Sequence, residues 1–172
     1  MHMRLWLTCL LIATVGFAAE AEFPEIQGHG GVFDIAGDPE GPKKGSRVVV
    51  DVTTSDYVGG VNKGFDRAAR FVNLLALGGD DDFKMAIILH GGATKEALSD
   101  DQYREKFGKA NPNRSLMAQL RKAGAEILVC GQSMTHSGFD VMRTAPEVDV
   151  ALSAATASMN RQGAGYALLS IQ

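Results

Sequence analysis

The sequence predicts a single α/β domain of three layers, in which a five-stranded, mostly parallel sheet carries helices on both faces. Five short apolar segments of strand length recur along the chain, at residues 46–53, 84–89, 126–130, 148–152 and 166–171. Stretches with helical spacing of apolar residues lie between them, and glycine or proline marks most boundaries. Because strands that alternate with helices are joined by right-handed crossovers, we expect parallel pairing and helices on both faces of the sheet.

The first 21 residues have the order of a secretory signal peptide. A positively charged start up to Arg4 is followed by an apolar run over residues 5–17 and then by small residues. The run is shorter than the roughly 20 residues that span a bilayer. Small-x-small cleavage sites end at Ala18 and at Ala21, and we favour Ala21 because acidic sequence follows it directly. We therefore expect an exported, periplasmic protein that makes no membrane contact once the signal is removed.

The composition of the chain limits its function classes. Cleavage leaves about 150 residues, which suits one domain with one core. A hydrophobic content of 45%, a charged content of 22% and a net charge of -3 argue against a basic nucleic-acid binder and against a disordered acidic tail. Cleavage would also remove Cys9 and leave Cys130 as a single thiol in an oxidising compartment. Such a thiol is buried and inert, paired with another chain, or kept for its reactivity.

Residues 22–45 are expected to form an extended N-terminal arm before the domain at residues 46–172. The arm is rich in glycine and proline and shows little hydrophobic periodicity. Its glycines at positions 28, 30 and 31 form no phosphate loop, because no strand precedes them and no Lys-Ser or Lys-Thr pair follows. We interpret the arm as a linker on the surface of the domain.

The first half of the domain begins with a strand over residues 46–53. Its continuous apolar centre is typical of a strand covered on both faces. Helical spacing over residues 65–76 predicts a helix that ends at Gly78 and Gly79. The second strand, at residues 84–89, leads into a glycine turn, and residues 94–107 suggest one or two short helical pieces.

The second half repeats this alternation. Asn111 and Asn113 offer capping chemistry for a helix that ends before Gly124, and the third strand follows at residues 126–130. We expect the next helix to start at Gly131 and to extend toward Met142. A fourth strand at residues 148–152, a helix over 154–161 and a closing strand at 166–171 complete the chain.

The ends of the first three strands are the predicted site. In open α/β sheets, ligands bind outside the carboxyl ends of the strands. Those ends hold residues 53–56, then His90, Gly91 and Gly92, and then Cys130, Gly131, Gln132 and Ser133. A thiol just before a helix lies in the field of free N–H groups, which favours the reactive thiolate.

Plainer interpretations of the same residues stay open. Cys130 ends an apolar run, where a cysteine often serves as a small buried hydrophobe. His90 either tunes a thiolate or satisfies a backbone carbonyl at the turn, and His136 is as easily a solvent-exposed side chain. A metal site made of these three residues is conceivable, but close-spaced Cys and His pairs are missing, so we predict no metal and no cofactor.

The sequence around Cys130 resembles the DsrE/DsrF-like family. The resemblance rests on Glu-Ile-Leu-Val-Cys-Gly-Gln-Ser-Met at residues 126–134, on Val-Asp-Val-Ala-Leu-Ser-Ala at 148–154 and on Gln-Gly-Ala-Gly-Tyr at 162–166. Residues 84–91 are similar to the family's second strand, so that the resemblance covers roughly residues 46–172. It implies a mainly parallel sheet of five strands and assembly as a homotrimer or homohexamer.

The resemblance also implies a function, because some members of the family relay sulfur through a cysteine at this position. Cys130 would then be the persulfide acceptor, with His90 and His136 as proton or orientation partners. The turn from Gly131 to Ser133, together with Gly91, would support the sulfur or a ligand. We therefore expect a periplasmic persulfide carrier or sulfurtransferase-like protein, whose partner is a sulfur donor or acceptor protein or a small sulfur compound. The alternative is a non-catalytic periplasmic module that binds a small ligand or a metal.

Overall fold

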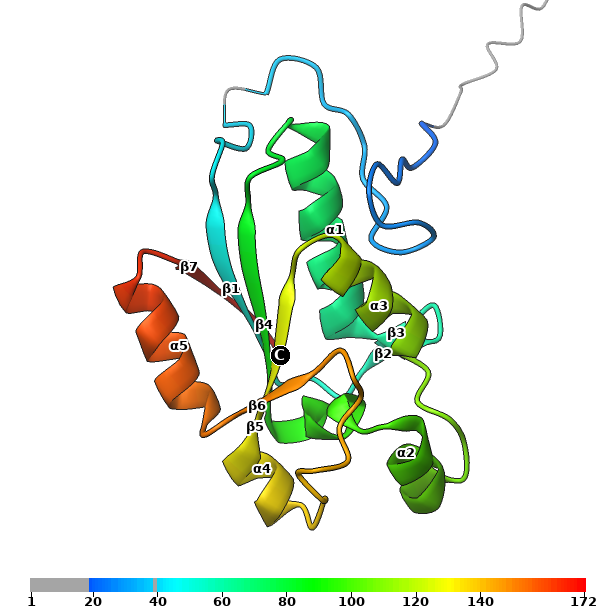
Figure 1. Cartoon of the computed structure of the whole chain (residues 1–172). Coiled ribbons are helices and arrows are strands. Elements are labelled where there is room, and N and C mark those ends of the chain that lie inside the picture. The colour runs from blue at the N-terminus through cyan, green and yellow to red at the C-terminus, as the bar shows by residue number, and fades with distance from the viewer. Residues whose placement is uncertain (1–18, 39) are drawn as a thin grey trace, which may run out of the picture.

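The computed structural model describes residues 19–38 and 40–172 (Figure 1). The predicted signal peptide falls mostly on residues 1–18, which lie outside the described residues. Within the described part of the chain, no helix has both the length and the apolar character needed to span a membrane.

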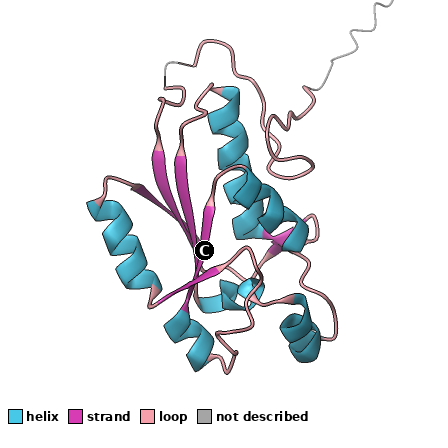
Figure 2. Cartoon of the chain, in the orientation of Figure 1, coloured by secondary structure: helices cyan, strands magenta, loops and turns pink. Residues whose placement is uncertain are grey.

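One parallel sheet organises the chain (Figure 2). From edge to edge its strands are β6 (Asp149–Ala151), β5 (Glu126–Cys130), β4 (Lys84–Leu89), β1 (Arg47–Val52) and β7 (Ala167–Ile171). Every neighbouring pair is parallel. The predicted fold class is confirmed, and each of these strands lies within a residue or two of its expected range.

Helices cover both faces of this sheet (Figure 1). Helices α1 (Lys63–Leu77) and α3 (Arg114–Lys122) pack on one face, and α5 (Ala154–Gly163) packs on the other. Three short helices, η1 (Gly91–Ala97), α2 (Asp100–Phe107) and α4 (Gly131–His136), follow β4 and β5. A small antiparallel hairpin of β2 (Tyr57–Val58) and β3 (Val61–Asn62), which the sequence did not predict, connects β1 to α1.

The face under α1 and α3 holds the main core. Helix α1 begins at the cap residue Asn62, whose side chain accepts a hydrogen bond from the amide of Gly64 at 2.8 Å. Its apolar stripe and that of α3 meet alternate residues of β1, β4 and β5. Fully buried side chains on this face include Phe65, Leu120 and Ile127. Burial of this apolar surface is the main source of the fold's stability.

The face under α5 holds a much smaller core. Its buried members are Val49, Ile88, Cys130 and Ala154. Leu168 on the edge strand β7 is 46% exposed, and Leu152 just before α5 is 75% exposed. A single helix therefore leaves part of this face open to solvent.

Two expectations about the helices were wrong. Helix α4 ends at His136 instead of continuing toward Met142, because Gly138 takes a left-handed conformation with φ of +68°. Amides after the helix then bond back to it, from Gly138 to the carbonyl of Thr135 and from Phe139 to that of Met134. Asn113 is the cap residue of α3, but its side chain makes no capping bond, because its Oδ1 accepts instead from the amide of Asn62 at 2.7 Å. Its side-chain amide donates to the buried carboxylate of Glu96 at 2.7 Å.

The arm contributes more to the fold than a surface linker would. Ile26 and Val32 are buried against the α1 and α3 side, at 1% and 3% exposure. Asn73 of α1 fixes this segment, because its carboxamide accepts from the amides of Glu25 and Ile26 and donates to three carbonyls of the arm. The arm thus covers the side of the molecule that already holds the main core.

Candidate functional site

The candidate site lies on the α5 face, where three adjacent strands end. Side chains alternate between the faces of a strand, so residues two apart share one face. On this face each strand contributes an apolar residue and then a polar one. The pairs are Val49 and Asp51 of β1, Ile88 of β4 and His90 just after it, and Leu128 and Cys130 of β5.

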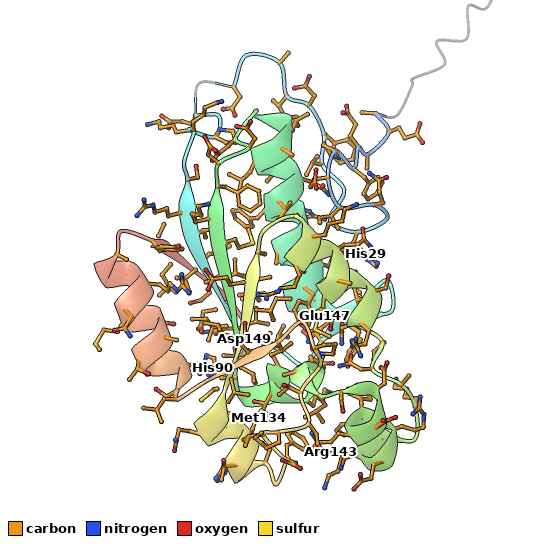
Figure 3. The ribbon with its side chains drawn as sticks, in the orientation of Figure 1. His29, His90, Met134, Arg143, Glu147 and Asp149 are labelled. Atoms are coloured by element: carbon orange, nitrogen blue, oxygen red, sulfur yellow. The ribbon has the colours of Figure 1, made fainter. Side chains whose placement is uncertain are left out.

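These polar residues open into one cavity of about 400 Å³. Figure 3 shows His90 beyond the end of β4, near the start of α5. The other walls come from the beginning of α5 and from β7. The lining residues are Asp51, His90, Cys130, Ser153, Ala154, Ala155, Ser158 and Leu168. The prediction that the second and third strands bring His90 and Cys130 to one site agrees with this geometry.

The thiol of Cys130 is held where β5 passes into α4. Cys130 is the cap residue of α4, and its Sγ accepts a hydrogen bond from the amide of Ser133 at 3.4 Å. Burial acts to raise the pKa of the thiol, but hydrogen bonds from the Ser133 hydroxyl and from the amides of Ala154, Ser133 and Gln132 outweigh it. The pKa therefore lies below its usual value, and the thiolate is favoured.

The backbone is closely packed around Gly131, the residue after Cys130. A Cβ atom at Gly131 would lie 3.0 Å from the carbonyl oxygen of Ala151, which is tighter than an ordinary contact. A side chain there would push α4 away from β6 and would change the position of the amides that face the sulfur. Gly131 thus allows the close approach of α4 to β6 that positions these amides.

Asp51 and His90 form a hydrogen-bonded pair that lines the same cavity as Cys130. Nε2 of His90 lies 2.9 Å from Oδ1 of Asp51, and both side chains are mostly buried. Asp51 was not among the predicted site residues, because it lies within the first strand and not in the polar residues that follow it. The signal was present in the interrupted run Val-Val-Val-Asp-Val, since a charge in a strand covered on both faces needs a partner.

The remaining predicted residues gather in a neighbouring hollow of about 420 Å³. It is lined by Gly91, Gln132, Ser133, His136 and Ser137. His136 therefore lies outside the cavity that holds Cys130. Residues 53–56 do not line the Cys130 cavity either. They lead into the β2–β3 hairpin, and Asp56 pairs with Lys63 at the start of α1.

The described residues contain no group of three His, Cys, Asp or Glu side chains that could hold a metal ion. The histidines considered for such a site with Cys130 line different hollows, His90 in one and His136 in the other. What the cavity does offer is a thiol whose ionised form is stabilised, a histidine paired with a carboxylate, and two serine hydroxyls. This set suits nucleophilic sulfur chemistry or the binding of a small ligand.

Comparison with known proteins places this site in a family context. Two solved structures share the fold: the protein of unknown function MTH1491 from Methanobacterium thermoautotrophicum, at 17% identity and a TM-score of 0.55, and the YchN protein from E. coli, at 13% and 0.52. Each match covers 73% of this chain and 99% of the other. No curated protein matches the sequence. The model of the DsrE/DsrF-like family matches residues 48–171, so the chain belongs to the DsrE/DsrF-like family.

Proposed function

We propose that this protein handles sulfane sulfur in the periplasm, as a persulfide carrier or sulfurtransferase-like protein that works through Cys130. The family is associated with sulfur relay, which supplies the chemical context. The observation that carries the proposal is the thiol itself, which lies at a cavity and has hydrogen bonds that favour its ionised form. A thiolate can accept sulfane sulfur and later give it up by thiol exchange.

The geometry suits the persulfide as well as the thiolate. A persulfide on Cys130 would extend into the cavity, whose walls include apolar groups such as Ala154 and Leu168. The cavity would shield the terminal sulfur from other thiols. His90 lines the same cavity, where its second ring nitrogen can accept or return a proton during transfer.

Export rests on the predicted signal peptide. Its removal would leave Cys130 as the only thiol of the mature protein. Intramolecular disulfide formation would then be impossible, and the thiol would stay available to a sulfur donor. The partner is a small sulfur compound or a protein that gives or accepts sulfur.

Assembly as a homotrimer or homohexamer is the second part of the proposal. Exposed apolar side chains occur on β6, on α5 and just before it, and on β7, and one of them, Leu168, lines the cavity. They are Val150, Leu152, Met159 and Leu168. Light scattering on the mature protein should give three or six times the mass of one chain, and a monomer at micromolar concentration would contradict assembly.

A non-catalytic binding module is the other candidate, and the burial of Cys130 favours it. The residue is only 5% exposed and packs beside Val49 and Ile88, as a purely structural cysteine would. In that case Cys130→Ser would leave ligand binding, assembly and cellular phenotype intact.

Mass spectrometry of the intact mature protein separates these functions. After incubation with polysulfide, hydropersulfide or thiosulfate, wild-type protein should gain the mass of one or more sulfur atoms, and Cys130→Ser should gain none. A matched control moves the thiol to the exposed position 115 of α3, as Ser115→Cys in the Cys130→Ser background. Equal loading of wild type and this control, or no loading of wild type by any donor, would contradict a sulfur-handling role.

A further inference from the structure

Asp51 is an unusual residue near the carboxyl end of an inner strand of this sheet. It lies in β1, between β4 and β7, and its neighbours on the same face include Val49 and Ile88. A carboxylate among such groups is costly unless it is paired. Within the part of the chain that the structure describes, its one side-chain partner is His90, at 2.9 Å. A purely structural role would be served at lower cost by an apolar residue at this position.

The pairing sets the state of His90. An ionised carboxylate only accepts hydrogen bonds, so the proton between the two groups lies on Nε2 of His90. Nδ1 is then the nitrogen that can accept a proton from a reacting group. Without Asp51 the ring would lose both its fixed orientation and its fixed tautomer.

Asp51 also determines the charge of the cavity. The lining residues include no lysine and no arginine, and their charged or titratable members are Asp51, His90 and Cys130. With the thiol ionised, two negative groups face the same partly enclosed space. An anion that enters meets repulsion from both, and low solvent exposure makes that repulsion stronger than in bulk water.

We propose that Asp51 is a positioning and specificity-determining residue: it holds His90 for proton transfer and disfavours oxyanion sulfur donors, so that Cys130 takes sulfur from a small uncharged hydropersulfide, R–S–SH. This inference rests on the proposed sulfur-handling function. The small size of the donor follows from the 5% exposure of Cys130 at a cavity of about 400 Å³, a volume typical of small-molecule sites.

The transfer step is balanced without an added oxidant or reductant. The Cys130 thiolate attacks the outer sulfur of R–S–SH, a new sulfur–sulfur bond forms on Cys130, and the donor's own sulfur–sulfur bond breaks. The electron pair of the broken bond leaves on the inner sulfur as RS⁻. Nδ1 of His90 takes the proton from the new Cys130 hydropersulfide and passes it to RS⁻. The products are the Cys130 persulfide anion and the thiol RSH.

The test compares two donors on the full mature protein. The rate of sulfur gain at Cys130 is measured by mass spectrometry with thiosulfate and with the hydropersulfide of N-acetylcysteine methyl ester. Mildly acidic buffer keeps part of that hydropersulfide protonated. Wild-type protein should gain sulfur faster from the hydropersulfide than from thiosulfate. Asp51→Asn should shift the rate ratio toward thiosulfate by about tenfold, because one negative charge is lost and His90 is released.

Two matched variants isolate the role of Asp51. Asp51→Glu keeps the charge and should keep most of the wild-type preference. Asp56→Asn removes the same charge from an exposed residue near the end of β1, outside the cavity, and should leave the ratio unchanged. If Asp51→Asn and Asp56→Asn give the same ratio as wild type, the inference is wrong.

The salt dependence of the loading rate is a second test, which uses only wild-type protein and so does not depend on whether a variant folds. Added salt should speed the loading of wild type from thiosulfate and leave loading from the hydropersulfide almost unchanged. A thiosulfate rate that is insensitive to salt and equal to the hydropersulfide rate would overturn the inference while sulfur handling by Cys130 stood. Failure of Cys130 to load from either donor would instead refute the proposed function.

Discussion

The two faces of the sheet differ in how they are covered and in what they hold. The face under α1 and α3 is filled by large buried side chains and is covered again by the N-terminal arm. The face under α5 has only a small buried cluster, exposed apolar residues at its edges, and a cavity that contains Cys130. Both faces use the same strands, since alternate residues of β1, β4 and β5 point to opposite sides.

Because of this difference, one face can provide the stability of the domain while the other holds the candidate site. Close packing tolerates no carboxylate, histidine or free thiol without a partner, whereas an incompletely covered face leaves room for them and for a ligand. The dense face therefore stabilises the domain, and the open face can hold a polar site at its end. Variants on the two faces should consequently affect different properties.

The largest expected effect comes from matched leucine truncations on the two faces. Leu120→Ala removes a fully buried side chain from the dense face and should lower the free energy of unfolding by about 2–5 kcal/mol. Leu128→Ala acts on a partly buried residue of the α5 face and should cost about 1–2 kcal/mol. Urea denaturation measures both, and equal losses would contradict the difference between the faces.

The next effect concerns the arm. Asn73→Ala removes the carboxamide that bonds to the backbone of residues 25–30, and should cost about 1–3 kcal/mol because buried polar groups lose their partner. Hydrogen exchange should rise in these residues and stay unchanged at Cys130. Asn160→Ala, at an exposed position of α5, is the control. Protection of the arm that survives Asn73→Ala would show that other contacts hold it.

Some features of the fold follow from local patterns in the sequence, and others depend on tertiary contacts or on backbone conformation. Apolar runs such as residues 84–89 identify buried strands directly, because burial on both faces demands them. Asn113 holds the cap position that the sequence predicts, but its side chain makes tertiary bonds to Asn62 and Glu96 instead of a capping bond. The end of α4 depended on Gly138, a glycine whose backbone conformation the sequence does not state.

The same limits apply to the site. Cys130 and His90 were predicted to share a site because one ends an apolar strand and the other directly follows one, and the ends of parallel strands meet. Asp51 and the start of α5 were not, because their place in the cavity depends on strand order and on how one helix lies across the sheet. Local pattern alone does not specify either.

A smaller effect is expected at the turn that holds the sulfur. Ser133→Ala removes a hydroxyl that stabilises the Cys130 thiolate and should slow alkylation at neutral pH by roughly threefold to tenfold, the value of one ordinary hydrogen bond. Ser137→Ala, one residue beyond the same helix, should not change the rate. Equal rates for the two variants would mean that the Ser133 hydroxyl does not stabilise the thiolate.

The smallest expected effect is a pH dependence of stability. Because the folded protein has the lower thiol pKa, the unfolded chain binds more protons in the window between the two pKa values. The stability of wild type relative to Cys130→Ser should therefore rise with pH through the folded pKa and level off above the unfolded value of about 8.5. Unfolding curves at several pH values measure this difference. A relative stability that falls as pH rises would contradict a lowered thiol pKa.

The pH dependence of Cys130 alkylation in the folded, mature protein tests the central claim most directly. Iodoacetamide rates should follow a titration with a pKa below about 8.5, because the amides of α4 and α5 and the Ser133 hydroxyl favour the thiolate. The exposed thiol of Ser115→Cys in the Cys130→Ser background should titrate near that ordinary value. A Cys130 pKa at or above that of the exposed thiol would contradict a reactive sulfur in this cavity.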